Sequence, residues 1–283
     1  MNRIKDYKEL QDSIVSWIKN YAESNGIKSL VVGVSGGIDS AVVSTLCAMT
    51  GIRTFCQIIS VDSNVEHLKM ASRHIKRIQE LYGTNSLGKY IVTYGSTDLT
   101  KTYNTFTWET MGKDVYEIDL LSLANIKSRL RMMALYAIAG EYAGIVVGTG
   151  NKIEDFGIGF FTKHGDGGVD ISPIADLYKT EVRELGRYMG IAEEILNAAP
   201  TDGLFPDNRT DEQQIGCTYE ELEWAMDLYD RTEWTILDGI LPFKSFNGDG
   251  LTTRQMKVLS LYADLNRKNQ HKILPIPVYK LPA

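Results

Sequence analysis

The sequence predicts an α/β fold, a doubly wound and mostly parallel sheet flanked by helices, with a helical C-terminal extension. Up to about residue 150, short apolar runs rich in β-branched residues alternate with helical segments, which is typical of right-handed βαβ crossovers. Beyond that point the strand signal fades and helical spacing dominates. We expect a single domain over 1–283, with an α/β core at about 25–200, a lid loop at about 202–216 and a helical part at about 217–283.

The individual elements follow in order along the chain. Apolar side chains at helical spacing predict a first helix over 5–24, which Asn25-Gly26 ends. Buried strands are expected at 30–34, 54–61, 90–94 and 145–148, with helices at 41–49, 66–82 and 121–142 between them. Later helices are expected near 178–189, 218–230 and 252–268. The segment 200–216, rich in Pro, Gly, Asp and Asn, is typical of a lid loop.

Composition excludes several classes of partner. The net charge is −6 and the chain has no basic tract, which argues against a nucleic-acid partner. The three cysteines, Cys47, Cys56 and Cys217, lack metal-ligand spacing, so a reduced, cytoplasmic protein is expected. Residues 1–25 are charged and amphipathic rather than a signal peptide, and no apolar run is long enough to span a membrane.

A glycine- and serine-rich loop between the first strand and the next helix predicts a phosphate site. Its residues are Gly33, Val34, Ser35, Gly36, Gly37, Ile38, Asp39 and Ser40. Glycines let the backbone approach a phosphate closely, and the helix N-terminus adds unpaired N–H groups and a positive dipole end. The alternative is an ordinary glycine turn. A Walker A loop is excluded because no lysine occurs between 29 and 52, and the dinucleotide fingerprint is not matched.

The pattern Ser-Gly-Gly-x-Asp-Ser that remains resembles the signature of ATP-pyrophosphatases, which cleave ATP between its α- and β-phosphates. Asp39 would lie near those phosphates and would repel them unless a cation intervened. We therefore interpret Asp39 as a ligand of Mg²⁺, with ATP as co-substrate.

Downstream motifs resemble, in the same order, those of the ammonia-dependent NAD synthetases. They lie at 125–132 (Asn-Ile-Lys-Ser-Arg-Leu-Arg-Met), 148–154 (Gly-Thr-Gly-Asn-Lys-Ile-Glu), 160–170, 173–180 (Pro-Ile-Ala-Asp-Leu-Tyr-Lys-Thr), 200–201 and 270–272. The resemblance implies that Thr149, Lys179 and Thr201 bind ATP and that Glu154 joins Asp39 as a metal ligand. It assigns the deamido-NAD substrate to Arg129, Lys163, Asp170, His271 and Lys272.

The resemblance also implies a reaction and a homodimeric assembly. The nicotinate carboxylate would attack the α-phosphorus of ATP, and ammonia would then displace AMP. Asp39 and Lys179 would act on the leaving pyrophosphate. Asp170 is the candidate acceptor for the ammonium proton, because none of the four histidines suits that role. A separate glutaminase partner, another amidotransferase of the same class, or a non-catalytic ATP-binding module are the alternatives.

Two stretches depart from the family pattern. After the second strand the family has an Arg and a Gln that frame ATP, whereas 59–64 reads Ile-Ser-Val-Asp-Ser-Asn. Between Glu154 and Lys163 the chain is one residue longer, and the glycine-rich turn there is expected to absorb the extra residue.

Overall fold

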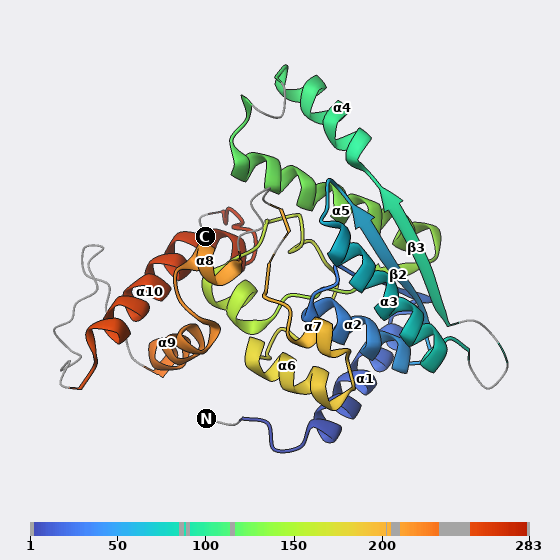
Figure 1. Cartoon of the computed structure of the whole chain (residues 1–283), viewed down its shortest axis with the longest axis horizontal. Helices are drawn as coiled ribbons and strands as arrows, with labels where there is room; N and C mark the ends of the chain where they lie inside the picture. The colour runs from blue at the N-terminus through green and yellow to red at the C-terminus, as the bar shows by residue number, and fades with distance from the viewer. Residues whose placement is uncertain are drawn as a thin grey trace.

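The computed structural model describes residues 3–84, 88, 91–113, 117–201, 203–204, 210–231 and 250–281. Its centre is a parallel sheet with the strand order β3-β2-β1-β4 (Figure 1). The strands are β1 (Ser29–Gly33), β2 (Arg53–Ser60), β3 (Val92–Asp98) and β4 (Gly144–Val146). All three strand pairs are parallel, and a bridge from Val147 to Ile171 extends the sheet beyond β4. The predicted parallel sheet is confirmed.

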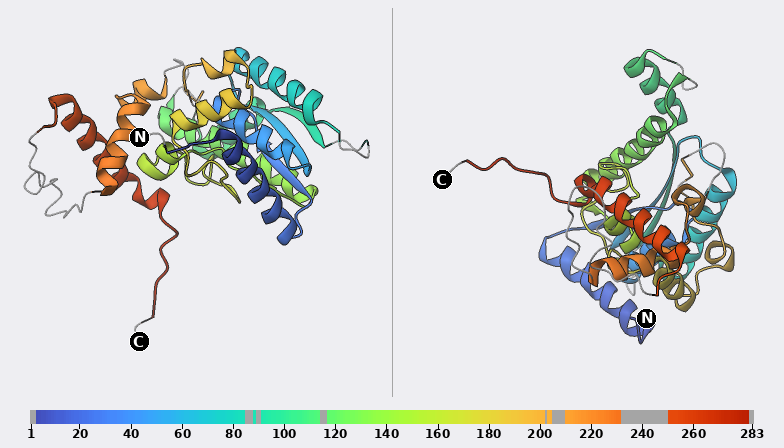
Figure 2. Two further views of the ribbon diagram at one scale, coloured as in Figure 1. Left: turned by 90° about the horizontal axis from the view of Figure 1, so that it is seen from below. Right: turned by 90° about the vertical axis from the view of Figure 1, so that its left-hand side faces the viewer.

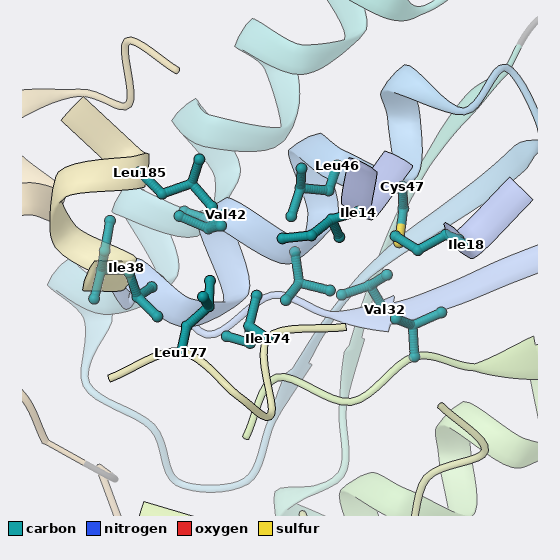
Figure 3. Packing of buried hydrophobic residues seen from close by; sticks show 14 of the residues in the cluster. Ile14, Ile18, Val32, Ile38, Val42, Leu46, Cys47, Ile174, Leu177 and Leu185 are labelled. Carbon is teal, nitrogen blue, oxygen red and sulfur yellow. The ribbon is translucent and has the colours of Figure 1, made fainter. Parts of the chain in front are cut away.

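Helices cover both faces of the sheet because the strands are apolar on both. One face carries α1 (Tyr7–Ser24), α2 (Ile38–Met49), α3 (Val65–Tyr82) and α6 (Lys179–Tyr188). Figure 3 shows Val32 of β1 packed among side chains of α1, α2 and α6. The opposite face, with Val31 of β1, packs against α5 (Leu120–Glu141). This arrangement is the doubly wound one that the alternating pattern predicts.

The C-terminal part has a core of its own. Helices α9 (Tyr219–Arg231) and α10 (Thr253–Ile273) pack together and against η2, a π-helix at Lys152–Ile158. The helical extension is therefore confirmed, and η2 joins it to the sheet. Beyond α10 the chain runs out from the body as an extended, exposed segment to residue 281 (Figure 2).

Besides η2, the described residues contain three α-helices where none was predicted. Helix α4 (Thr100–Met111) is rich in threonine and buries only Tyr103 and Thr107, so it has no regular apolar face to recognise. Helix α7 (Glu193–Leu196) is a single turn. Helix α8 (Asp211–Ile215) lies inside the predicted lid loop, of which 202 and 205–209 fall outside the described residues. The single-domain boundaries stay a prediction.

The expectation that the glycine-rich turn between Glu154 and Lys163 absorbs an extra residue stays a prediction. Residues 152–158 form a π-helix, which the left-handed turn at Gly159 ends. Glu154 thus lies in a π-helical segment, a geometry common at functional sites.

None of the helices in the described ranges has both the length and the apolar character that a bilayer crossing requires.

Candidate active site

The candidate site lies where the strand order of the sheet reverses. The chain passes from β1 to β2 on one side and returns to β4 on the other side of β1. In such sheets, ligands bind in the crevice beyond the carboxyl ends of the two strands that flank the reversal. A cavity of about 310 Å³ opens there, between residues 33–40 after β1 and residues 146–150 at and after β4. The prediction that the first and fourth strands flank the site agrees with this geometry.

The predicted phosphate loop lines this cavity along all eight of its residues. Gly36 has φ +93°, and a Cβ there would lie 2.5 Å from the carbonyl oxygen of His67, so the turn requires glycine. The backbone N–H of Ser35 donates to Ser40 Oγ (3.1 Å), which in turn donates to the carbonyl of Gly37 (3.0 Å). The hydroxyl of Ser40 therefore shapes the loop from inside, while the N-terminus of α2 points at the cavity.

Lys179 lies between two carboxylates at the floor of the cavity. Its Nζ donates to Asp39 Oδ2 (2.5 Å) and to Glu154 Oε1 (2.9 Å). The lysine side chain is 4% exposed. Burial by itself would lower the pKa of Lys179, but the two carboxylates outweigh burial and the pKa is raised. Lys179 therefore stays charged, and three predicted residues from three distant segments meet at one point.

Helix ends and a buried tyrosine hold this cluster in place. Asn151 begins η2, where its side chain accepts from the amide of Glu154 (3.0 Å) and donates to Asp39 Oδ1 (3.4 Å). The hydroxyl of Tyr219, on α9, donates to Glu154 and lies 3.3 Å from Asp211 Oδ2. Sequence reasoning quoted Asn151 within a motif but gave it no role. It missed Tyr219 and Asp211, which no local pattern connects to the loop.

Two further acidic side chains face the same cavity. Asp155 and Asp166 both line it, and burial raises the pKa of each. Asp166 Oδ1 accepts from Ser128 Oγ (2.7 Å) and from the amide of Thr162 (3.0 Å), which lowers its pKa in part. Burial also raises the pKa of Asp39, more than Lys179 offsets.

This donor set fits Mg²⁺ held jointly by protein and phosphate. Within the described ranges, no three His, Cys, Asp or Glu side chains form a metal centre of their own. Mg²⁺ commonly takes one or two carboxylates and completes its shell with phosphate oxygens and water. Asp39 and Glu154 offer the carboxylates beside the phosphate loop.

The residues predicted to bind the second substrate gather in a separate group. Arg129 Nη2 donates to the carbonyl of Lys163 (3.3 Å), and Lys163 Nζ donates to the carbonyl of His271. Lys272 Nζ, at the end of α10, donates to the carbonyl of Phe161 (2.8 Å). Arg129, Lys163 and Lys272 thus meet His271 around the 160s loop, next to the cavity but outside its lining.

Of the remaining predicted residues, two line the cavity and one lies outside it. Thr149 and Thr201 both line the cavity. Asp170 does not line it, and its carboxylate accepts from Tyr136 Oη (3.1 Å) and from the amide of Val146 (2.7 Å). The structure therefore brings Thr149 and Thr201 to Asp39, Glu154 and Lys179, and leaves Asp170 apart.

Comparison with known proteins agrees with this geometry. A family model described as NAD synthase matches residues 10–272. The NH(3)-dependent NAD(+) synthetase of Carboxydothermus hydrogenoformans is 37% identical over 224 residues, covering 77% of this chain and 84% of the relative. That of Sulfurisphaera tokodaii is 32% identical, covering 98% and 90%. A structure of NMN synthetase from Francisella tularensis superposes with a TM-score of 0.79 at 27% identity, covering 98% of this chain and 100% of that one. The chain belongs to the NAD synthase family.

Proposed function

We propose that this C–N bond-forming enzyme amidates deamido-NAD with ammonia at the expense of ATP, giving NAD, AMP and pyrophosphate. The observation that carries the proposal is Lys179 held between Asp39 and Glu154 beneath the phosphate loop. That arrangement suits a leaving pyrophosphate, because it places a charged lysine, the N-terminus of α2 and two carboxylates suited to Mg²⁺ at one point. The family match and the names of the curated relatives support the choice of substrate.

In the proposed first step, in which pyrophosphate leaves ATP, different residues have different roles. The loop amides and the α2 N-terminus bind the departing phosphates, and Lys179 neutralises charge that develops on the oxygen bridging the α- and β-phosphates. Bound Mg²⁺, held by Asp39 and Glu154, would supply charge compensation between the carboxylates and the phosphates. Thr149 and Thr201 are proposed to contact ATP from the cavity wall.

The second substrate is proposed to enter from the 160s loop. Arg129, Lys163 and Lys272 offer positive charge for its phosphates, with His271 beside them, and the nicotinate carboxylate would reach the cavity over this loop. Asp170 is proposed here as a substrate-binding residue. Its role as the acceptor of the ammonium proton is less favoured, because Tyr136 and Val146 already use its oxygens.

The direct test is an incubation of the protein with ATP, Mg²⁺, ammonium and deamido-NAD, followed by chromatography of nucleotides and dinucleotides. We expect NAD and AMP in equal amounts, and AMP only when deamido-NAD is present. Formation of ADP, or AMP release that ignores deamido-NAD, would contradict the proposal. Replacing ammonium by glutamine should stop the reaction, and activity with glutamine only after adding a second protein would favour a glutaminase partner.

A second candidate substrate is the deamidated mononucleotide. The Francisella tularensis structure is named an NMN synthetase, and its likeness to this chain covers nearly the full length of both. Nicotinate mononucleotide carries the same reacting carboxylate, so the first step would be unchanged. Measuring kcat/KM for both acids side by side decides between them, and we expect deamido-NAD to be preferred.

The assembly and the compartment are proposed on the family resemblance alone. We propose a homodimer in the cytoplasm. Analytical ultracentrifugation should give about twice the 31.7 kDa of the chain, and a sedimentation coefficient typical of one chain would contradict the dimer.

A further inference from the structure

The turn that follows β2 is held by an unusual number of contacts from other elements. Asp62 has φ +51°, a left-handed conformation that few non-glycine residues adopt. The amide of Asp62 donates to Thr100 Oγ1 (3.0 Å), and the amide of Val61 donates to Ser63 Oγ (3.1 Å). The turn 61–64 is therefore fixed in one shape and does not behave as a loose connection.

Two cations from one side of α5 add the strongest contacts. Arg131 Nε donates to the carbonyl of Ile59 (3.1 Å), and its Nη2 donates to Ser63 Oγ (3.1 Å). One turn earlier, Lys127 Nζ pairs with Asp62 Oδ2 at 3.2 Å. The Lys127 side chain is 8% exposed, so its charge is committed to this turn.

The turn matters because it forms one end of the cavity. Ser63, Asn64 and His67 line it together with Ile59, on the side of the phosphate loop that lies toward α3. The other end lies at the 160s loop, next to Arg129, Lys163 and Lys272, which are assigned to the second substrate. With the triphosphate on the loop and the second substrate at the 160s end, the α3 end is left for the ribose and base of ATP.

We propose that Arg131 and Lys127 are positioning residues for the ATP nucleoside, acting by holding the turn 61–64 at the α3 end of the cavity. This inference rests on the proposed use of ATP. The stretch from β2 into α3 has no arginine of its own between 54 and 72. In this chain the supporting cations would instead come from α5. Helix α5 then serves both ends of the site, because Ser128 and Arg129 hold the 160s loop from the same two turns.

The test compares two ligands that share only the phosphate loop. Isothermal titration calorimetry with Mg²⁺ would measure binding of α,β-methylene-ATP, which the enzyme cannot cleave, and of inorganic pyrophosphate. In Arg131→Met we expect affinity for the ATP analogue to fall tenfold or more, with pyrophosphate affinity within twofold of the unmodified protein. Equal losses for both ligands would show a general structural effect and overturn the proposal, as would unchanged binding of the analogue.

Asp62→Asn tests the Lys127 contact separately. Asparagine accepts the left-handed backbone as aspartate does, so this change removes the charge without straining the turn. We expect the same split between analogue and pyrophosphate, at several-fold. Arg254→Met is the matched control, because Arg254 also makes two hydrogen bonds to one carboxylate, that of Glu221 in the C-terminal helices. This variant should change the affinity for neither ligand.

If the unmodified protein forms NAD while both variants bind the analogue normally, only this inference fails. If the unmodified protein binds neither ligand, the proposed function fails.

Discussion

Tyr219 and Glu154, 65 residues apart in the chain, share a hydrogen bond at the centre of the site. The tyrosine hydroxyl donates to the same Oε1 atom that accepts from Lys179. Tyr219 is fully buried, and burial, together with Glu154 and Asp211, raises its pKa. The hydroxyl therefore remains a donor at any working pH, and helix α9 helps to set the direction of the Glu154 carboxylate.

Tyr219→Phe should therefore lower turnover while leaving the packing in place. Without the donor, Glu154 loses one of two groups that orient it, and we expect kcat to fall about tenfold, equivalent to roughly 1.4 kcal/mol. Steady-state kinetics at saturating ATP and Mg²⁺ measures the change. Tyr262→Phe is the control, since Tyr262 is equally buried in the same core but away from Glu154. A kcat equal in the two variants would show that the hydrogen bond does not assist catalysis.

Among the described residues, Lys179→Met removes the only cation that contacts both Asp39 and Glu154. The loss of a charge that acts on the leaving phosphate typically costs about 10²–10³ in kcat. We expect at least this loss in AMP formation, measured by single-turnover kinetics. Lys152→Met is the matched control, because Lys152 pairs with the exposed Asp176 outside the cavity. Near-normal turnover in Lys179→Met would remove Lys179 from the mechanism.

Ser128 contacts Asp166 twice. Its hydroxyl donates to Oδ1 (2.7 Å) and accepts from the Asp166 amide (2.9 Å). Because the serine lowers the pKa of Asp166 in part, Ser128→Ala should raise that pKa further. We expect the free energy of unfolding to fall by about 1–2 kcal/mol in urea titrations. Ser16→Ala, at an exposed position of α1, should change it by less than about 0.5 kcal/mol. Equal values for the two variants would contradict the role of Ser128.

The sequence predicts best those features that depend on residues close together in the chain. The phosphate loop consists of consecutive residues, and the strand before it and the helix after it are adjacent in the sequence. Glu154 and Lys179 were predicted from sequence motifs. They meet Asp39 because all three residues follow parallel segments whose carboxyl ends lie at the same edge of the sheet.

Other features depend on contacts that no spacing encodes. Tyr219 and Asp211 reach the site only because α8 and α9 fold back over η2. The third strand is longer than predicted because its second half, up to Asp98, lies half exposed at the sheet edge and lacks an apolar run. Helix α4 escaped prediction because packing against α5, and not its own periodicity, stabilises it.

His74 gives a prediction on pH. It is buried against α2, with its Nε2 3.0 Å from Ser44 Oγ, and burial lowers its pKa from 6.5 to about 4. A histidine with a lowered folded-state pKa binds fewer protons folded than unfolded, so its contribution to stability is full above about pH 6.5 and is lost between 6.5 and 4. Between pH 7.5 and 4.5 this group should cost about 2 kcal/mol of unfolding free energy. His74→Gln should remove that share, so its urea stability should fall less over this interval than that of the unmodified protein. Parallel pH profiles for the two proteins would show that His74 is not buried in its neutral form.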